Sequence, residues 1–212
     1  MGRYYSLEFI TKTENLLKLL QAFSKRLSEG DRERFKDFDL YEPAYEETIS
    51  DNCGNKSTIK HGLKFINIGE FEDKNYYCFS LVSEIDEGII NNFPGYKKYI
   101  ENNKLSIGCA WTSLYVGENN VLLKVDAAST NISLIFEESK NIHKLCSDIA
   151  EEVGNTKVYL DKEEYLYLQI FPENKEFIKQ DIDISSNDKL ISTFNVDAYV
   201  KEVENLADKD LC

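Results

Sequence analysis

In Leu105-Ser-Ile-Gly-Cys-Ala-Trp-Thr-Ser-Leu-Tyr-Val116, Gly117-Glu-Asn-Asn120 and Val121-Leu-Leu-Lys-Val125, two apolar segments flank a short polar loop. Segments rich in β-branched and aromatic residues predict strands, and a four-residue polar loop between them is typical of a hairpin. A third strand is predicted over residues 131–136. The middle of the chain therefore predicts a β-hairpin with a further strand beside it.

Apolar residues then recur at helical spacing from Ser139 onward. They are Ile142, Leu145, Cys146, Ile149, Ala150 and Val153, which share one face of a helix. Gly154 is expected to end this helix, because glycine adopts a positive φ without steric cost. Two more strands are predicted over residues 157–160 and 165–171. The second half of the chain thus predicts a sheet with a helix covering one face.

The first half has a comparable pattern. Residues 4–10 predict a strand, and Thr11 and Glu14 have the spacing of a capping box at a helix start. The helix is predicted from the apolar stripe Leu16, Leu19, Leu20, Phe23 and Leu27, and Gly30 is expected to end it. Residues 41–54 read as loop. Strands are predicted over 63–68 and 76–82, and a short helix is predicted after the turn signal Phe93-Pro-Gly95.

The order strand, helix, strand, strand therefore occurs twice, with Ser6-Leu-Glu-Phe9 and Ser133-Leu-Ile-Phe136 each preceding a helix. We predict an α+β fold of antiparallel sheets with helices packed on one face, built from two split-βαβ, or ferredoxin-like, halves. The first half is residues 1–104 and the second is residues 105–212, with an acidic C-terminal helix over 196–206. Together they are expected to form one compact unit. Convergent patterning without duplication is the alternative explanation.

The composition indicates a globular protein that does not bind polyanions. Of the 212 residues, 42% are hydrophobic and 30% are charged, and the net charge is −13. Affinity for nucleic acid comes mainly from Lys and Arg, so this charge argues against nucleic-acid binding, and anionic membrane surfaces are disfavoured for the same reason. The charge favours a basic protein partner. The alternative is that acidity serves only solubility.

Cysteine usage and hydropathy bear on the compartment. The five cysteines, Cys53, Cys78, Cys109, Cys146 and Cys212, form no CxxC pair and no regular spacing, so neither disulfides nor a zinc site is predicted. No apolar run has the length of a membrane span, and no secretory leader is recognised. These features predict a reduced, cytoplasmic protein without a membrane anchor.

Few residues suggest chemistry. His143 and Cys146 lie one helical turn apart, but Cys146 belongs to the apolar stripe and is interpreted as core. A nucleophilic pair of Cys53 and His61 has no local signature to support it. We find no phosphate-binding loop, dinucleotide fingerprint, catalytic serine motif or EF-hand. We therefore predict no catalytic, cofactor-binding or metal-ligating residue, and a protein that is not an enzyme; an enzyme would require His61 or a carboxylate pair in a cleft.

In size, acidity and reduced cysteines the chain is similar to immunity proteins, which neutralise toxins by binding them. This general resemblance implies a protein-binding inhibitor. Aromatic anchors and acidic side chains would make the contact: Phe93, Tyr96, Tyr99, Asp181, Asp183, Glu202 and Glu204. The acidic residues belong to a segment, 161–212, that has 13 acidic and 6 basic side chains. The alternative is a small-molecule-binding module with a ligand groove between the two halves. The sequence indicates no oligomeric state.

Overall fold

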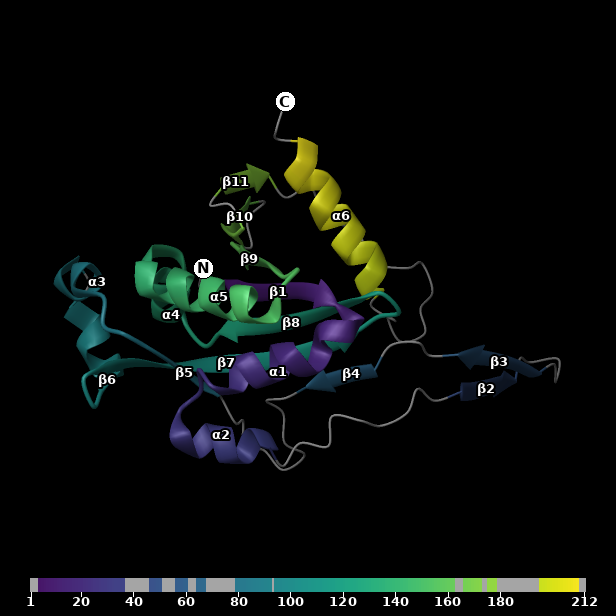
Figure 1. Ribbon diagram of the computed structural model, residues 1–212, viewed down its shortest axis with the longest axis horizontal. Coiled ribbons are helices and arrows are strands. Elements are labelled where there is room, and N and C mark those ends of the chain that lie inside the picture. Colours follow the sequence, from purple (N-terminus) through teal and green to yellow (C-terminus); the bar gives the residue numbers. More distant parts are fainter. Residues whose placement is uncertain are drawn as a thin grey trace.

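The computed structural model describes residues 4–36, 46–50, 56–60, 64–67, 79–92, 94–162, 166–172, 175–178 and 195–209 (Figure 1). Within these ranges one sheet contains nine strands: β1 (Ser6–Lys12), β4 (Lys64–Asn67), β5 (Ser80–Ser83), β6 (Ile100–Glu101), β7 (Lys104–Val116), β8 (Asn120–Ala127), β9 (Lys157–Asp161), β10 (Leu166–Phe171) and β11 (Lys175–Ile178). Its main path runs β11-β10-β9-β1-β8-β7-β4, and β5 and β6 also pair with β7. All pairings are antiparallel.

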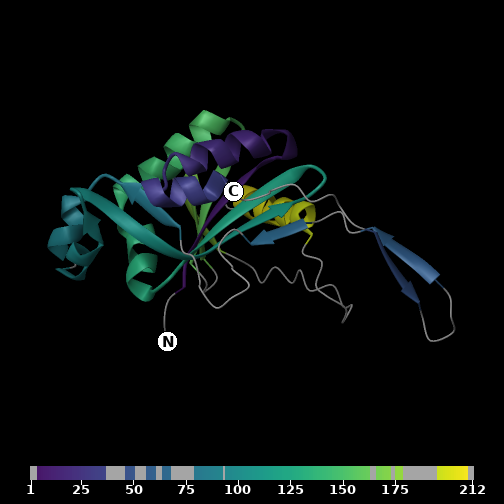
Figure 2. The same ribbon diagram turned by 90° about the horizontal axis from the view of Figure 1, so that it is seen from below.

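Six α-helices and two 3₁₀ helices complete the described part of the chain: α1 (Leu16–Ser24), α2 (Glu29–Lys36), α3 (Glu87–Asn92), α4 (Thr130–Glu138), α5 (Lys140–Val153), α6 (Val196–Lys209), η1 (Thr13–Asn15) and η2 (Pro94–Tyr99). The predicted α+β fold with antiparallel sheets is therefore confirmed. None of these helices has both the length and the apolar character that crossing a membrane requires. A separate hairpin of β2 (Glu46–Ser50) and β3 (Lys56–Lys60) lies apart from the main sheet in both views (Figure 1, Figure 2).

The centre of the sheet has the strand order β9-β1-β8-β7, and the chain passes through it as β1, α1, β7, β8, α5, β9. Because each neighbouring pair is antiparallel, β1 runs parallel to β7 and β8 runs parallel to β9, with one strand between the members of each pair. This is the arrangement of one split-βαβ unit. The first predicted half contributes β1 and α1 to this unit, so two separate ferredoxin-like halves are not confirmed.

The prediction of a strand over residues 131–136 is wrong, because this segment forms α4. The Ser129 hydroxyl accepts a hydrogen bond from the Ile132 amide at 3.4 Å and so caps the helix. Ile132, Ile135 and Phe136 are buried, at i, i+3 and i+4. A short apolar run fits the repeat of a helix and that of a strand, and here the serine cap and the buried helical stripe favour the helix. The proposed internal repeat therefore lacks its second leading strand.

The first helix is confirmed in its stripe but not in its ends. Leu16, Leu19, Leu20 and Phe23 are buried as predicted. No capping box forms: the Thr11 hydroxyl donates instead to the carbonyl of residue 155 at 3.3 Å, and η1 precedes α1 without a side-chain cap. The helix ends at Ser24, and residue 30 lies inside α2.

Both ends of α5 follow the prediction. The Ser139 hydroxyl accepts from the Ile142 amide at 3.2 Å, and all six predicted stripe residues are buried. Gly154 ends the helix with φ of 79°. The buried stripe packs against α1 and the first face of the sheet, where it joins the main core with Leu7 and Phe9 of β1.

Replacing Gly154 with alanine is expected to lower the free energy of unfolding by about 1 kcal/mol. An added Cβ would meet nothing within 4 Å, so the cost comes from the backbone angle and not from a clash. Urea unfolding followed by circular dichroism measures the change. The matched control is Gly30→Ala, which adds a methyl group in open space within α2 and is expected to stabilise the protein slightly; equal losses in both variants would contradict the backbone explanation.

The opposite face of the sheet carries a second core under α6. Val196, Val200, Val203 and Leu206 of the helix pack with sheet residues of alternate parity, among them Ile10. Figure 2 shows α1 and α5 together above the sheet. The sequence predicted helices on one face only, whereas the buried side chains of α1, α4 and α5 share the core on one face and those of α6 the core on the other. The reason is that β1, β8 and β9 carry apolar residues on both faces.

Candidate functional site

A cleft of about 720 Å³ opens on the side of the sheet that carries α1 and α5. It lies between the α1–α2 junction, strands β5 and β7, and α5. It is lined by Lys25, Arg26, Leu27, Ser28, Glu29, Arg32, Val82, Ser83, Glu84, Glu101, Asn102, Lys104, Ser106, Asn141, Lys144, Leu145 and Asp148. The lining residues come from both predicted halves of the chain. A ligand groove between those halves was the alternative that the sequence left open, and that function stays a prediction.

One wall is fixed because the segment after α1 runs along β5. The Val82 amide donates to the carbonyl of Arg26 at 2.8 Å, and the Ser28 amide donates to the carbonyl of Ser80 at 2.9 Å. Leu27, which lies between these two bonds, is 1% exposed. The backbone of residues 26–28 therefore acts as a short extra strand, and it holds the side chain of Arg26 at a defined place on the cleft wall.

The start of α2 is attached to the same strand through a buried carboxylate. Asp31 is 3% exposed and accepts from the Ser80 amide at 2.8 Å and from the Ser28 hydroxyl at 2.7 Å. The Ser28 hydroxyl in turn accepts from the Asp31 amide at 3.3 Å, as an N-cap does. These hydrogen bonds fix the angle between the start of α2 and β5. Arg32, one turn after Ser28, then lines the cleft.

The opposite wall is the first half of α5. Asn141 donates from its side-chain amide to the carbonyl of Ile85 at 3.0 Å, and Asp86 accepts from the Lys140 amide at 3.1 Å. The segment after β5 is thereby tied to the helix start. Leu145 and Leu27 are 6% and 1% exposed and form the apolar floor of the cleft, and the half-buried Val82 adds apolar surface. The cleft thus has a partly apolar interior between two anchored walls.

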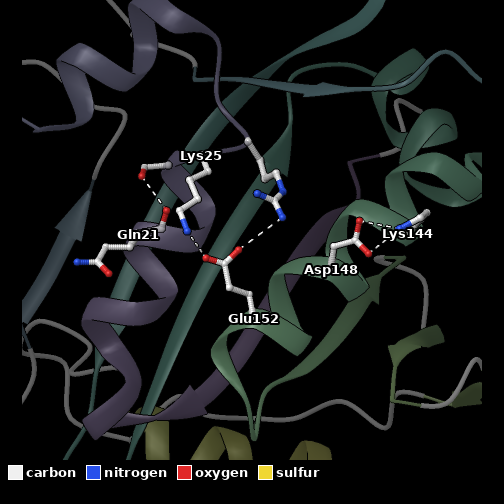
Figure 3. Close-up of polar contacts among 7 residues, drawn as sticks. Gln21, Lys25, Lys144, Asp148 and Glu152 are labelled. Atoms are coloured by element: carbon white, nitrogen blue, oxygen red, sulfur yellow. Dashed lines mark hydrogen bonds and ion pairs between the residues drawn. The ribbon is translucent and has the colours of Figure 1, made fainter.

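Ion pairs surround this interior. Glu152 of α5 pairs with Lys25 and, at 3.6 Å, with Arg26, while Lys144 pairs with Asp148 at 2.7 Å. Figure 3 shows Lys25 and Glu152 pointing toward one another, with Lys144 and Asp148 at a separate position on α5. These side chains are 27% to 69% exposed, so each pair contributes about 1 kcal/mol or less to stability. The pairs can therefore exchange partners with a ligand.

The titratable groups near the cleft that could react are directed into the protein. His143 of α5 places Nε2 2.7 Å from the carbonyl of Phe136, and burial lowers the pKa of its imidazole, with that hydrogen bond acting in the opposite direction. Cys146 is fully buried, and burial raises the pKa of its thiol. Its interpretation as core is confirmed. Among the described residues, no group of three or more His, Cys, Asp or Glu could hold a metal ion. Cys53 and His61 lie outside the described residues.

A second polar cluster lies under α6, on the other face of the sheet. We call it the Glu8 centre and define it as Glu8, Lys124, Asp126, Tyr167 and Tyr199. Glu8 is 1% exposed and accepts from the Tyr199 hydroxyl at 2.6 Å, and its other oxygen lies 3.5 Å from Lys124 Nζ. The hydroxyls of Tyr167 and Tyr199 are 2.5 Å apart. The centre connects the middle of the sheet to α6 through charged and hydroxyl groups.

Charge and burial act together on the Glu8 centre. Burial lowers the pKa of Lys124, but Glu8 and Asp126 raise it by more, so the net shift is upward. Burial raises the pKa of Tyr167 and of Tyr199, and the negative charge of Glu8 adds to both shifts. The protonated forms of the lysine and both tyrosines are therefore favoured in the folded state.

Of the predicted partner-binding residues, the four that the structure describes do not lie together. Tyr96 of η2 is 2% exposed, so its side chain offers almost no area to a partner, and Tyr99 is partly buried with its ring 6.4 Å from that of Tyr96. Glu202 and Glu204 lie on α6, at the other end of the molecule from α3 and its neighbouring η2 (Figure 1); Glu204 pairs with Lys157 at 2.9 Å. Phe93, Asp181 and Asp183 lie outside the described residues. Their role in binding a partner stays a prediction.

The cleft residues were not singled out from the sequence, although one signal was present. The chain has four arginines, and three of them, Arg26, Arg32 and Arg34, lie within nine residues. Two of these three line the cleft. No protein-family model matches the chain, and the comparisons with curated proteins and with solved structures returned no match either.

Proposed function

We propose that this protein is a ligand-binding module whose cleft between α1, α2, β5, β7 and α5 receives a small molecule. The observation that carries the proposal is the cleft of about 720 Å³. That volume falls in the range of about 300–1,000 Å³ over which proteins bind small molecules. Apolar surface of the cleft, to which the half-buried Val82 contributes, packs against the body of a ligand, and the charged and amide side chains around it fix its orientation.

A screen for ligand-induced stabilisation tests the proposal. Organic acids, nucleotides, amino acids and neutral metabolites are added one class at a time, and the midpoint of thermal unfolding is measured. A ligand at about 100 times its dissociation constant adds about 2.7 kcal/mol, which shifts Tm by several degrees. We expect at least one class to give such a shift. Absence of a shift with every class would overturn the proposal.

Filling the cleft is expected to abolish the shift for whichever ligand gives one. Ser106 of β7 lines the cleft and is half-buried, so Ser106→Phe places a ring in the ligand's space. The matched control is Asn205→Phe, which adds the same ring to an exposed position on α6. We expect the Tm shift to disappear in the first variant and to persist in the second, with each variant's Tm without ligand measured as its own reference. A shift that survives Ser106→Phe would place the ligand elsewhere.

A protein-binding inhibitor, such as an immunity protein acting in the cytoplasm, is the second candidate. The net charge of −13 supports it, together with the outward side of α6, where Glu202 is half-buried and Asp208 is exposed. A basic protein partner would be attracted to such a surface. A pull-down at low and moderate salt is expected to retain one stoichiometric partner that is lost in Glu202→Lys/Asp208→Lys; equal recovery with both forms would remove α6 from the interface.

A further inference from the structure

Cationic side chains gather at one end of the cleft, although the chain as a whole is strongly acidic. Lys25, Arg26 and Arg32 all line the α1–α2 end. Three carboxylates belong to the same end, but only Glu29 lines the cleft: Glu152 lies at its edge, and Asp31 is 3% exposed and bonded to Ser28 and Ser80. Among the side chains that line this end, three cations against one carboxylate leave an excess of positive charge, in a protein with a net charge of −13. Among the described residues, this excess favours the approach of an anion to this end of the cleft.

Arginine is the side chain best suited to recognise such an anion. Its planar guanidinium presents several N–H donors in a fork that matches a phosphate or carboxylate, whereas lysine offers a point charge. The chain uses arginine at only four positions, against 21 lysines, and two of those four line the cleft. This concentration distinguishes the α1–α2 end from the lysine-bearing rim around residues 104 and 144.

The two arginines are held in place differently. Arg32 donates from Nε to the carbonyl of Leu27 at 3.2 Å, and no carboxylate of the described residues forms an ion pair with it. Arg26 is partly desolvated, with 27% of its side chain exposed, and its Nη2 lies 3.6 Å from Glu152. A distance of 3.6 Å is an ion pair without a good hydrogen bond. Both guanidinium groups therefore retain N–H donors for a ligand.

Glu152 occupies a distinct position in this arrangement. It holds Lys25 and Arg26 from the edge of the cleft without itself lining it. Figure 3 shows the carboxylate of Glu152 directed toward Lys25 across the space between α1 and α5. One carboxylate shared by two cations leaves one positive charge uncompensated. An anion in the cleft would meet the same two cations from the other side.

We infer that the ligand of the cleft carries a phosphate or carboxylate group, which Lys25, Arg26 and Arg32 receive, and that Glu152 is the resident counter-ion from which the ligand's anion takes these cations. This inference rests on the proposed function of the cleft. The ligand also carries an apolar part, because the half-buried Val82, whose amide bonds to the carbonyl of Arg26, lines the cleft beside the cationic end. Phosphate and carboxylate share this chemistry, and the probes below distinguish them.

Four probes test the inference by isothermal titration calorimetry: phenyl phosphate, benzoate, inorganic phosphate and benzyl alcohol. The two aromatic anions combine the apolar and anionic parts, inorganic phosphate has only the anion, and benzyl alcohol has only the ring. We expect at least one aromatic anion to bind at least about tenfold more tightly than benzyl alcohol, since a charge-assisted hydrogen bond contributes enough for that factor. The better of phenyl phosphate and benzoate identifies the anionic group.

Variants then locate the site. Arg26→Gln and Arg32→Gln each are expected to weaken the aromatic anion about tenfold. Glu152→Gln is expected to tighten it by up to about fivefold, the factor for releasing an exposed ion pair. Glu151→Gln is the matched control: it changes the net charge by the same amount on the same helix, but at an exposed carboxylate that does not line the cleft. We expect Glu151→Gln to change the affinity by less than Glu152→Gln does.

The outcomes separate the inference from the proposed function. Equal tightening by Glu152→Gln and Glu151→Gln would mean a general field effect and would overturn the role of Glu152. Binding of benzyl alcohol or a neutral metabolite without preference for the anions would overturn the anionic ligand and leave the cleft as a ligand site. Failure of all four probes and of every metabolite class would overturn both. Circular dichroism and urea unfolding of each variant confirm that it is folded.

Discussion

Replacing Glu8 with alanine is expected to lower the free energy of unfolding by about 3 kcal/mol. Glu8 is 1% exposed, and its removal leaves Lys124 with the longer ion pair to Asp126, at 3.9 Å, in a partly dehydrated site. It also leaves the Tyr199 hydroxyl without its carboxylate acceptor. Removing one member of a buried ion pair typically costs about 3–5 kcal/mol, and the lower end applies because the Lys124 side chain is 28% exposed. Urea unfolding followed by far-ultraviolet circular dichroism measures the loss.

Two further variants show whether charge causes the loss. Glu8→Gln keeps an acceptor for the Tyr199 hydroxyl and nearly the same volume, so it removes only the charge opposite Lys124. Its decrease in the free energy of unfolding is expected to be smaller than that of Glu8→Ala. Glu8→Leu/Lys124→Met removes both charges, and apolar replacement of a buried pair is often close to neutral. The double variant is therefore expected to be more stable than Glu8→Ala. A double variant that is less stable would contradict the electrostatic account.

Hydrogen exchange shows where the loss occurs. The Glu8 centre connects β1 to α6 through Tyr199, so Glu8→Ala is expected to raise amide exchange in α6 more than in α5. The latter packs on the opposite face, against the main core. Uniformly faster exchange in both helices would mean that the variant acts only through global unfolding.

The sequence predicted the β-strand that contains Glu8 but not the importance of that residue. A strand alternates between two faces, and a carboxylate between Leu7 and Phe9 normally faces solvent. Glu8 is buried because α6, nearly two hundred residues later, covers the second face of the sheet. The amphipathic pattern of α6 was predicted, but no local rule states which face a distant helix will cover. The Glu8 centre therefore could be identified only from the tertiary structure.

Local rules predicted the fold best where several signals agreed. The hairpin of β7 and β8 had two apolar segments and a polar loop, and α5 had a serine cap, a full stripe and a terminal glycine. Residues 131–136 had only a short apolar run, which fits a strand and a helix equally, and the wrong choice there suggested a duplication. The true relation, one split-βαβ unit with β1 inserted between β8 and β9, depends on pairing between residues more than a hundred positions apart.

The cleft could have been located in part from the sequence. Three arginines within nine residues of an acidic chain are an unusual concentration, and arginine is the residue that recognises anions by shape as well as charge. The sequence could not show that Leu27 pairs with Leu81 and so turns this segment toward α5. It also could not show that Glu152 approaches Lys25 from another helix. The identity of the residues indicates which groups could recognise an anion, and long-range pairing determines where in the fold those groups lie.

Stability is expected to fall steeply above pH 10, because buried tyrosines must lose protons on unfolding. Burial raises the pKa of Tyr159, Tyr167 and Tyr199 above the ordinary value of 10.0, and burial raises that of Tyr96 to about 12. Below pH 10 each hydroxyl is protonated in both states, so these groups add no pH dependence there. Above pH 10 the unfolded chain releases the protons and the folded chain retains them. Each such tyrosine then lowers the free energy of unfolding by up to about 1.4 kcal/mol per pH unit.

Lys124 also lowers the free energy of unfolding as the pH rises, because its pKa is raised in the folded state. Its stabilising contribution is fully present below the ordinary pKa of lysine and is lost as the pH rises toward the folded value. Tyrosines and lysine together therefore predict an alkaline loss of several kcal/mol. Urea unfolding at a series of pH values between neutral and strongly alkaline measures it, and tyrosinate absorption should appear together with loss of circular dichroism, because ionisation and unfolding are coupled.

Tyr159→Phe separates the alkaline effect from neutral stability. The Tyr159 hydroxyl is buried without a hydrogen-bond partner among the described residues, so its removal is expected to leave stability at neutral pH unchanged or slightly higher. Above pH 10, however, the slope should decrease by up to about 1.4 kcal/mol per pH unit, the contribution of one tyrosine. Tyr4→Phe, at a side chain that is 56% exposed, is the matched control and is expected to keep the original slope. Equal slopes in Tyr159→Phe and Tyr4→Phe would contradict the contribution of the buried Tyr159 hydroxyl to the alkaline loss.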